Sequence, residues 1–337
     1  MYHFLTSGKL SSGEAVDFGY VEAPDLEWSG RLLTFLAHKA PDWRFHLERA
    51  FVDSLDGLRT RFYIATVHEE LVSQVMISDA RGCGILSHVF TAPQWRRRNA
   101  YRQLMAIQME HCAASGIKIL TLSTGFNTHP YWIYHSFGFR SIAPGSGAMM
   151  WKVSPESDRE LLQPSATVTT RALRWEDWPV LNVSAVQPVM PSEPLPRFST
   201  MGVSGQGNLE GSFISFQRRI QAFDTEFQRV QVTEHGAVGG WCFFSPDPGW
   251  FNRVWRADIC ALPAFTEICS QSPDSMSWPE APIWTVTTSD KGKAQWLHTL
   301  GFSQRTVLKG WLERKGYPMD AEVWERPFVS KSTFLNK

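Results

Sequence analysis

The sequence lacks long apolar runs and has few cysteines, and both features narrow the classes of protein that it can encode. Its apolar stretches fall short of the roughly 18 residues that a membrane-spanning helix requires. The five cysteines are an odd number and form no Cys-x-x-Cys pair, which disfavours a disulfide framework and a zinc site. The first residues also lack the apolar segment of a secretion signal. We therefore expect a soluble cytoplasmic protein without a metal centre.

An excess of charge of either sign is also absent. The chain has 33 basic and 33 acidic residues, and its formal net charge is zero. Proteins that bind nucleic acid generally carry a basic excess, so the composition disfavours that class of partner. The local cluster Arg96-Arg97-Arg98 keeps one alternative open, in which it forms the binding face of a nucleic-acid modifier.

Apolar residues are plentiful, at 43% of 337 residues, which suffices for two packed domains. Their periodicity predicts a helix capped by Asp25, a helix at 43–55, a long helix opened by the arginine cluster and ended by Gly116, and a short helix at 130–136. Strands are expected at 14–22, 60–67, 71–78, 84–91, 117–123, 138–141 and 148–153.

The second half of the chain repeats this order of elements. Strands are expected at 167–173, 227–233, 237–244, 254–262, 283–287 and 307–313, and helices at 175–186 and 211–223. The string LHTLGF at 297–302 resembles YHSFGF at 134–139. Two copies with so long a period indicate duplicated domains. We expect an α/β (α+β) protein with domains at 1–153 and 167–337, joined by a polar linker at 154–166.

The stretch TAPQWRRRNAYRQLM, from Thr91 to Met105, places arginines where a helix is expected to begin. Exposed cations there cost roughly 0.3–1 kcal/mol each, because the helix dipole is positive at that end. A pyrophosphate bound to the free N–H groups of the first turn would make the same charges favourable. The alternative is that the arginines only extend into solvent.

Two separated motifs resemble those of the GNAT superfamily, acyltransferases that use acyl-coenzyme A. Thr91-Ala92-Pro93 is similar to the family's V-x-P, and Arg96 matches the first position of its [Q/R]-x-x-G-x-[G/A] loop. Asn127, Tyr134 and Gly138-Phe139 match N-x-x-A-x-x-x-Y-x-x-x-G-F. The resemblance implies two tandem domains, each with a mixed, mostly antiparallel sheet flanked by helices. It also implies that the fourth and fifth strands of the sheet splay apart to admit the pantetheine arm.

The resemblance further implies a coenzyme site. Its expected residues are Phe90, Thr91, Arg96, Arg97, Arg98, Asn99, Ala100, Tyr101 and Asn127. Asn99 and Tyr101 replace the glycines of the family loop. Asparagine tolerates unusual backbone angles well, whereas Tyr101 puts a side chain where the family lets the backbone approach phosphate. Asn127 could equally cap the short helix.

The mechanism implied by the resemblance is direct transfer to an amine. Tyr134 would donate a proton to the leaving thiolate, and a backbone N–H near Phe90 would polarise the thioester carbonyl. His88 could act as the general base, directly or through water. The alternatives are a packed helix tyrosine and a hydrogen-bonded sheet histidine.

We therefore expect an N-acetyltransferase that uses acetyl-coenzyme A, or another acyl-coenzyme A, on a small-molecule or peptide amine, as a monomer or homodimer. The competing hypothesis is a catalytically inactive scaffold or acyl-CoA sensor, favoured by the lost glycines. The second copy is expected to be degenerate, because Thr266–Cys269, Leu297 and Asp290 occupy the places of the arginine loop, Tyr134 and Asn127. The loop at 188–208 could be a lid.

Overall fold

The computed structural model describes residues 1–165, 167–186, 198–203, 208–223, 227–250, 253–270, 278–288, 291–314 and 317–328. Asp290 and most of the loop at 188–208 lie outside these residues. The chain forms two compact units, which are described separately. The first contains residues 1–161, 174–186 and 208–218, and the second contains residues 162–173, 187–207 and 219–337.

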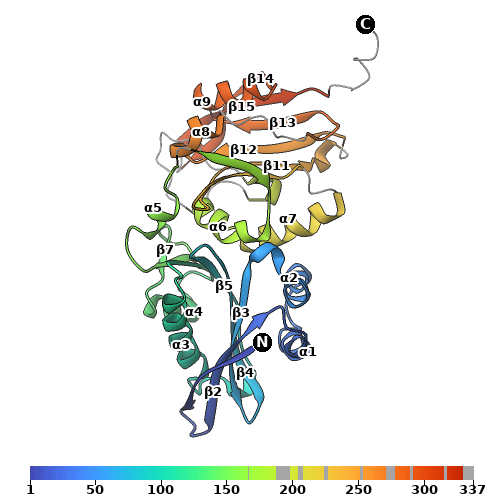
Figure 1. Cartoon of the computed structure of the whole chain (residues 1–337). Coiled ribbons are helices and arrows are strands. Elements are labelled where there is room, and N and C mark those ends of the chain that lie inside the picture. The colour runs from blue at the N-terminus through green and yellow to red at the C-terminus, as the bar shows by residue number, and fades with distance from the viewer. Residues whose placement is uncertain are drawn as a thin grey trace. The chain divides into compact units, whose positions relative to one another are not determined.

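The first unit is built on an eight-stranded sheet (Figure 1). The strands are β1 (Tyr2–Lys9), β2 (Ala15–Ala23), β3 (Arg59–Val67), β4 (Glu70–Ala80), β5 (Cys83–Thr91), β6 (Ile119–Ser123), β7 (Arg140–Ser141) and β8 (Ala148–Lys152). Their order is β1-β2-β3-β4-β5-β6-β8-β7, and only β5 and β6 run parallel. The strand β1 was not predicted, because its largely polar sequence pairs only at the sheet edge, with β2.

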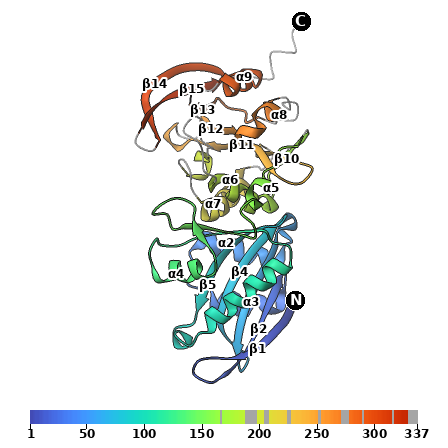
Figure 2. The same cartoon turned by 90° about the vertical axis from the view of Figure 1, so that its left-hand side faces the viewer.

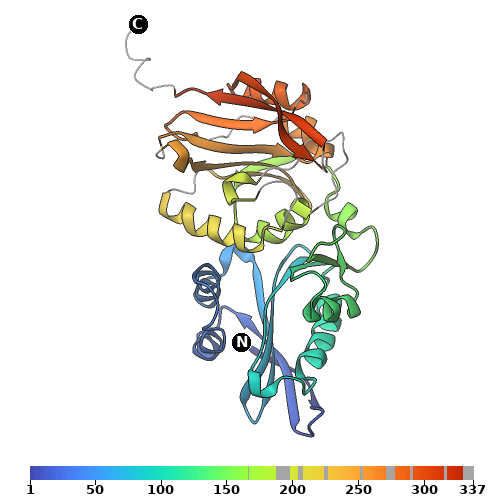
Figure 3. The ribbon, with the colours of Figure 1, turned by 180° about the vertical axis from the view of Figure 1, so that it is seen from behind.

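Helices cover both faces of this sheet. The helices α1 (Leu26–Phe35) and α2 (Pro41–Val52) lie on one face, and α3 (Ala100–Ala114) and α4 (His129–Ser136) on the other, as Figures 1 and 3 show. Strand β4 shows that both faces of the sheet are apolar and need to be covered. Val75 and Ile77 pack in the core beside α3, whereas Met76 packs in the core beside α1 and α2. Alternating side chains point to opposite faces of a strand, so an apolar run such as this one is buried on both sides. The Asp25 carboxylate accepts a bond of 3.1 Å from Trp28 N and caps α1, as predicted.

Strands β5 and β6 separate after a short contact. Only Cys83, Gly84 and Ile85 pair with β6, although β5 continues to Thr91. On its other edge β5 carries a β-bulge, because Gln74 pairs with Phe90 whereas Met76 pairs with Ser87. His88 lies in the bulge with a left-handed φ of 52°. A bulge bends its strand, and the predicted separation of the two parallel strands is confirmed.

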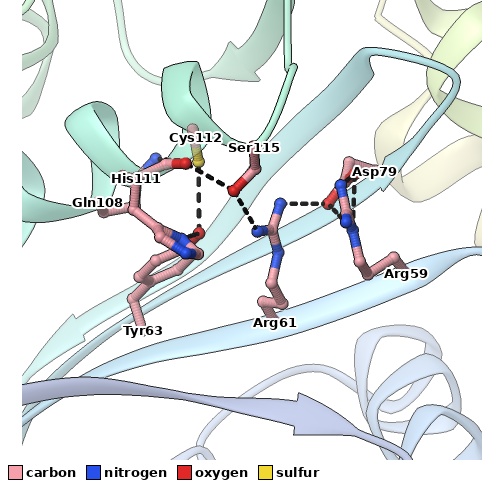
Figure 4. Close-up of polar contacts among 8 residues, drawn as sticks. All are labelled: Arg59, Arg61, Tyr63, Asp79, Gln108, His111, Cys112 and Ser115. Carbon is pink, nitrogen blue, oxygen red and sulfur yellow. Dashed lines mark hydrogen bonds and ion pairs between the residues drawn. The ribbon is translucent and has the colours of Figure 1, made fainter. Parts of the chain in front are cut away.

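A buried polar network fastens α3 to the sheet (Figure 4). The Arg61 guanidinium lies between Asp79 on β4, at 2.8 Å, and Ser115 Oγ at the end of α3, at 3.2 Å. The Tyr63 hydroxyl lies 2.8 Å from His111 Nδ1. Buried charges are tolerated when they are paired and hydrogen-bonded, so this network fixes the position of α3 relative to β3 and β4.

The second unit contains a seven-stranded sheet. Its strands are β9 (Val168–Ala172), β10 (Arg229–Thr233), β11 (Val238–Pro246), β12 (Trp255–Ala261), β13 (Ile283–Thr287), β14 (Ser303–Arg314) and β15 (Tyr317–Arg326), and its helices include α8 (Thr266–Ser270) and α9 (Lys291–Thr299). The order β9-β10-β11-β12-β13-β15-β14 repeats that of β2 to β8 in the first unit. Here too a single pair, β12 and β13, is parallel. The predicted fold class, with two mostly antiparallel sheets flanked by helices, is confirmed.

The structure corrects several element boundaries. Helix α3 begins at Ala100, so Arg96, Arg97 and Arg98 lie in the preceding turn and not in the helix. The predicted linker contains a short helix, α5 (Ser157–Leu161). Strand β15 was not predicted. The described helices are too short or too polar to cross a lipid bilayer.

The first unit also includes residues of two helices that follow β9 in the chain. They are α6 (Trp178–Val186) and the start of α7 (Glu210–Phe223), which group with the first sheet. Asn182 on α6 donates a bond of 2.7 Å to Thr121 Oγ1 on β6, and its Oδ1 atom accepts a bond of 2.6 Å from Leu209 N. One buried side chain thus connects β6 to the residue before α7. The predicted domain limits of 153 and 167 describe the sequence repeat and stay a prediction.

Candidate active site

A cavity of about 780 Å³ opens where β5 leaves β6. It lies among the end of β5, the turn after it and the first turns of α3 and α4, which face the viewer in Figure 2. It is lined by Val89, Phe90, Thr91, Trp95, Arg96, Arg97, Asn99, Ala100, Tyr101, Arg102, Thr124, His129, Pro130, Ile133 and Tyr134. Seven of the nine predicted coenzyme-site residues are therefore brought together, and Arg98 and Asn127 are placed elsewhere.

The backbone at the start of α3 has the properties of an anion site. Arg97 and Asn99 adopt left-handed φ angles of 62° and 67°. Asn99 is the N-cap of α3 but makes no side-chain capping bond, and the first turn carries no acidic residue. The first amide groups of a helix have no intrahelical acceptor. Asn99 adopts a conformation that glycine would adopt readily, so the missing glycine does not prevent this turn from forming.

The arginines of the cluster have different surroundings. Arg96 and Arg97 are exposed and line the cavity, and Arg96 Nε donates a bond of 3.1 Å to the carbonyl of Thr91. Arg98 instead forms an ion pair of 2.6 Å with Glu14 and stacks 4.8 Å above the ring of Trp95. Arg98 thus holds the arginine turn against the connection between β1 and β2, and Arg96 and Arg97 are the two members of the cluster that line the cavity.

A further cation at this cavity was missed in the sequence. Arg102 lies in the first turn of α3 and lines the cavity with Arg96 and Arg97. Its position two residues after Ala100 could have indicated this, because residues in a helix's first turn surround the same free amide groups. The cavity therefore combines unbonded helix-start amides with three guanidinium groups, which fits a pyrophosphate.

Tyr101 forms a wall of the cavity and leaves it open. Its hydroxyl donates to Met105 Sδ at 3.6 Å, one turn further along α3, and its ring lies edge-on to Tyr134 with centroids 6.5 Å apart. Burial raises the pKa of Tyr101 well above its usual value, with a further contribution from Tyr134. The side chain therefore follows the helix toward the core.

Asn127 lies outside both the cavity and the cap of α4. Its Oδ1 atom accepts a bond of 2.9 Å from Trp132 Nε1, and its φ is 59°. The N-cap of α4 is Thr128. Neither role considered for Asn127 matches this placement, and a coenzyme contact stays a prediction.

A second cavity, of about 280 Å³, adjoins the first. It is lined by Lys39, Trp43, Leu86, Ser87, His88, Val89, Leu122, Ser123, Tyr134 and Glu210. Val89 and Tyr134 line both cavities. A group that passes from a ligand in one cavity to a ligand in the other would therefore cross beside the Tyr134 hydroxyl.

Tyr134 is buried, with 7% of its surface exposed. Its pKa is raised to about 12, chiefly by burial and in part by the charge of Glu210, while the interaction with the Tyr101 hydroxyl opposes the rise. The hydroxyl consequently keeps its proton near neutral pH and can donate it. This state is the one required of a proton donor to a thiolate.

His88 lies in the second cavity, edge-on to Trp43 with ring centroids 4.7 Å apart. Its Nε2 atom has no hydrogen-bond partner among the described residues. Burial lowers its pKa well below the usual value, and the nearby charges of His46, Lys39 and His38 lower it further. His88 is therefore neutral near pH 7 and weakly basic.

Glu210 is another residue of this site that the sequence did not indicate. It is the first residue of α7 and is 8% exposed, and Asn208 Nδ2 donates a bond of 2.9 Å to its carboxyl group. Burial raises its pKa to about 8. It pairs with no cation among the described residues. Glu210 and Tyr134 are far apart in the sequence, and no sequence motif contains both. The fold brings them to the same cavity.

The described residues include no group of three or more His, Cys, Asp or Glu side chains that could hold a metal ion. The five cysteines are buried and free. Tyr134, His88 and Glu210 are the side chains of the second cavity that can take part in acid–base chemistry.

The segment that forms the larger cavity is similar in sequence to a known protein family. Residues 38–147 match the sequence model of an acetyltransferase (GNAT) domain. No curated protein sequence matches the chain. Among solved structures, a GNAT-family acetyltransferase from Staphylococcus aureus is similar over 41% of this chain and 99% of its own, with 16% identity and a TM-score of 0.34.

Two further structures show similar values. The PaiA N-acetyltransferase of Thermoplasma acidophilum, solved with coenzyme A, is similar over 40% of this chain and 98% of its own, with 13% identity and a TM-score of 0.31. The GNAT domain of S. lividans PAT is similar over 44% of this chain and 96% of its own, with 12% identity and a TM-score of 0.34. The segment that matches the family model contains β3 to β6, α3 and α4, and it is similar to acetyltransferase domains of the GNAT superfamily.

Proposed function

We propose that the first unit transfers an acetyl group, or another short acyl group, from acyl-coenzyme A to an amine by direct transfer. The observation that carries the proposal is the pair of adjoining cavities that share Val89 and Tyr134. One cavity fits a polyanion, and the other presents a buried carboxyl group. The two ligands of a direct transfer need such an arrangement, because effective reaction requires them to be held in contact.

The larger cavity would hold the coenzyme. Free amide groups of α3 and the guanidinium groups of Arg96, Arg97 and Arg102 would bind its pyrophosphate. The pantetheine arm would follow the gap between β5 and β6 to the point where Val89 and Tyr134 meet. The N–H groups on β5 beyond the last β6 pair, including that of Phe90, would polarise the thioester carbonyl.

We assign the role of general base to Glu210 and not to His88. A base works best when its pKa lies near the working pH, and the pKa of Glu210, at about 8, meets this condition. The pKa of His88 is lowered well below its usual range. His88 would then serve as a neutral wall of the acceptor cavity.

Tyr134 would act as the acid. As the carbon–sulfur bond breaks, its hydroxyl would give a proton to the leaving thiolate. Because Tyr134 lines both cavities, its hydroxyl would lie beside that sulfur, and its raised pKa would keep the proton available. The acceptor is proposed to be a small-molecule or peptide amine in the cytoplasm.

The second unit is proposed to be a degenerate copy. Where the first unit has its arginine turn, the second has α8, which bears Glu267 in its first turn and no arginine. Leu297, at the place of Tyr134, is buried and has no proton to give. Binding of acyl-coenzyme A by this unit is therefore disfavoured.

The competing proposal is an acyl-CoA sensor without catalysis, favoured by Tyr101 in the coenzyme loop. Titration calorimetry with acetyl-coenzyme A, followed by an assay of amine-dependent thiol release, separates the two. Binding with thiol release supports the transferase. Binding without release across a broad set of amines supports the sensor, and no binding to the folded protein contradicts both.

A further inference from the structure

The acceptor cavity is lined by one basic and one acidic side chain, and neither forms an ion pair with any of the described residues. Lys39 is half-buried and forms no ion pair among the described residues, and burial lowers its pKa. Glu210 is buried and is bonded through its carboxyl group only to Asn208 among those residues. Both side chains line the same 280 Å³ cavity. Desolvated charges are costly unless paired, so the cavity is complementary to a ligand with one charge of each sign.

The two side chains act electrostatically on different neighbours. The charge of Glu210 acts on Tyr134, which borders the coenzyme cavity, whereas the charge of Lys39 acts on His88. A ligand's ammonium group at Glu210 would thus face the thioester. Its anionic group at Lys39 would lie on the side of His88.

The remaining walls limit the size and polarity of the ligand. Apolar surface comes from Trp43, Leu86, Val89 and Leu122, and hydroxyl groups come from Ser87 and Ser123. A volume of about 280 Å³ accommodates a small molecule and no folded segment. The cavity therefore suits a compact, partly apolar molecule with two charged ends.

We propose that the acceptor is a free amino acid, with its ammonium group at Glu210 and its carboxylate at Lys39. This inference rests on the proposed acyltransferase function and narrows its acceptor. A polyamine or aminoglycoside would bring several cations against Lys39, which is unfavourable. A peptide N-terminus has no carboxylate near its amine and would leave Lys39 unpaired.

The transfer balances with the groups present. The ammonium group loses one proton to ionised Glu210, which keeps it until the thiol has formed and then returns it to solvent. The amine nitrogen then forms a bond to the acyl carbon as the carbon–sulfur bond breaks. The thiolate takes a proton from Tyr134, and the nitrogen gives up its second proton to restore that hydroxyl. The products are an N-acyl amino acid and the free thiol.

The test compares matched ligands with the full-length protein. L-Leucine is paired with isopentylamine, which lacks the carboxylate, and with 4-methylpentanoic acid, which lacks the amine; L-methionine, L-phenylalanine and L-glutamate are compared in the same way. Saturation-transfer NMR measures binding without turnover, and thiol release from acetyl-coenzyme A measures turnover. We expect at least one amino acid to bind, and to be acetylated, roughly ten- to hundredfold better than either analogue, the range for one charge-assisted hydrogen bond.

Two variants and one control separate a specific effect from a general one. Lys39→Met should raise KM for the amino acid by roughly tenfold or more while leaving isopentylamine unaffected, and Lys39→Arg should retain most of the preference. Lys9→Met, which removes an exposed lysine on β1, should change neither the KM for the amino acid nor that for isopentylamine.

The outcomes distinguish a wrong assignment of the acceptor from a wrong assignment of the acyltransferase activity. If acetyl-coenzyme A binds and simple amines are acetylated as well as amino acids, the inference is overturned and the proposed function stands. If no amine is acetylated but amino acids still bind and lose affinity in Lys39→Met, the cavity assignment stands and the proposed function fails. Absence of amino-acid binding in NMR overturns the inference directly.

Discussion

Glu210 and Tyr134 line one cavity, and the negative charge of Glu210 raises the pKa of the Tyr134 hydroxyl. The two groups are therefore coupled. When Glu210 accepts a proton, the charge that raises the pKa of Tyr134 disappears, and the hydroxyl becomes a stronger acid. In the proposed reaction this change occurs when the thiolate needs its proton, so proton uptake at one end of the site favours proton release at the other.

The pH dependence of activity should report Glu210. Its pKa is raised to about 8 by burial, so the ionised base becomes more abundant as pH rises through that value. We expect kcat/KM to rise with pH and to level off above about 8. Glu210→Gln should lower kcat by roughly 10²–10⁴-fold and remove this step. Ionisation of the amine contributes equally to both profiles, so their difference isolates Glu210; identical profiles would remove it from the mechanism.

The same carboxyl group should make stability depend on pH. In the unfolded chain it ionises near 4.5, whereas in the folded state its pKa is about 8. The folded state thus holds a proton that the unfolded state has released, and stability falls as pH rises between these values. Urea unfolding at several pH values measures the free energy of unfolding of Glu210→Gln relative to that of the parent protein. This difference should shift in favour of the variant by up to a few kcal/mol between acid and alkaline pH. A constant difference would show that Glu210 is not desolvated.

Tyr134→Phe should separate chemistry from binding. The variant keeps the ring that packs against Tyr101 and Phe139 but removes the hydroxyl. We expect kcat to fall by roughly 10²–10⁴-fold with the calorimetric affinity for acetyl-coenzyme A unchanged. Tyr131→Phe is the matched control, because Tyr131 is a buried tyrosine of the same helix whose hydroxyl bonds to Ser141 and lines neither cavity. Equal losses in the two variants would point to packing as the cause.

Most helices and strands could be predicted from the sequence, because hydrophobic periodicity and turn residues determine local structure. The N-cap at Asp25 and the hairpin of β3 and β4 depend on neighbours within a few residues. Strand β1 escaped prediction because it is a polar edge strand, stabilised by pairing with β2 more than by its own pattern. The start of α3 was placed too early, because the arginine turn continues the helix-like composition although Asn99 adopts a left-handed φ.

The candidate site was only partly accessible to the same reasoning. Tyr134, Arg96 and Arg97 stand at motif positions and line the cavities. Glu210 and Lys39 do not, because the fold brings them to the site from distant segments. Asn182, which bonds to Thr121 and to Leu209, is what holds the start of α7 beside β6. Such a contact depends on tertiary structure and leaves no periodic signal.

The arginine turn offers a comparison within one short segment. Arg96, Arg97 and Arg102 line the coenzyme cavity, whereas Arg98 is paired with Glu14. Arg96→Gln and Arg102→Gln should each weaken acetyl-coenzyme A binding by roughly ten- to hundredfold, and both effects should shrink at high salt. Arg98→Gln should leave affinity nearly unchanged. Calorimetry at low and high salt measures this, and an equal loss for Arg98→Gln would contradict the assignment of the pyrophosphate site.

The buried network beneath α3 should be sensitive to the loss of a single charge. Asp79 and Arg61 are 2% and 1% exposed, and their side chains are 2.8 Å apart. Asp79→Ala would leave the Arg61 cation buried without its partner, which typically costs about 3–5 kcal/mol. Arg59, the other cation on Asp79, has a side chain that is 41% exposed, so Arg59→Met should cost about 1 kcal/mol or less.

Chemical unfolding measures the free energy of unfolding of these two variants. The double variant Arg61→Met/Asp79→Ala is measured in the same way. Replacing both charges removes the unpaired ion, so the double variant should be more stable than Asp79→Ala alone. Because Arg61 also bonds to Ser115 at the end of α3, loss of the network should loosen that helix against the sheet. A double variant less stable than Asp79→Ala would mean that Arg61 stabilises the fold mainly through Ser115 and packing.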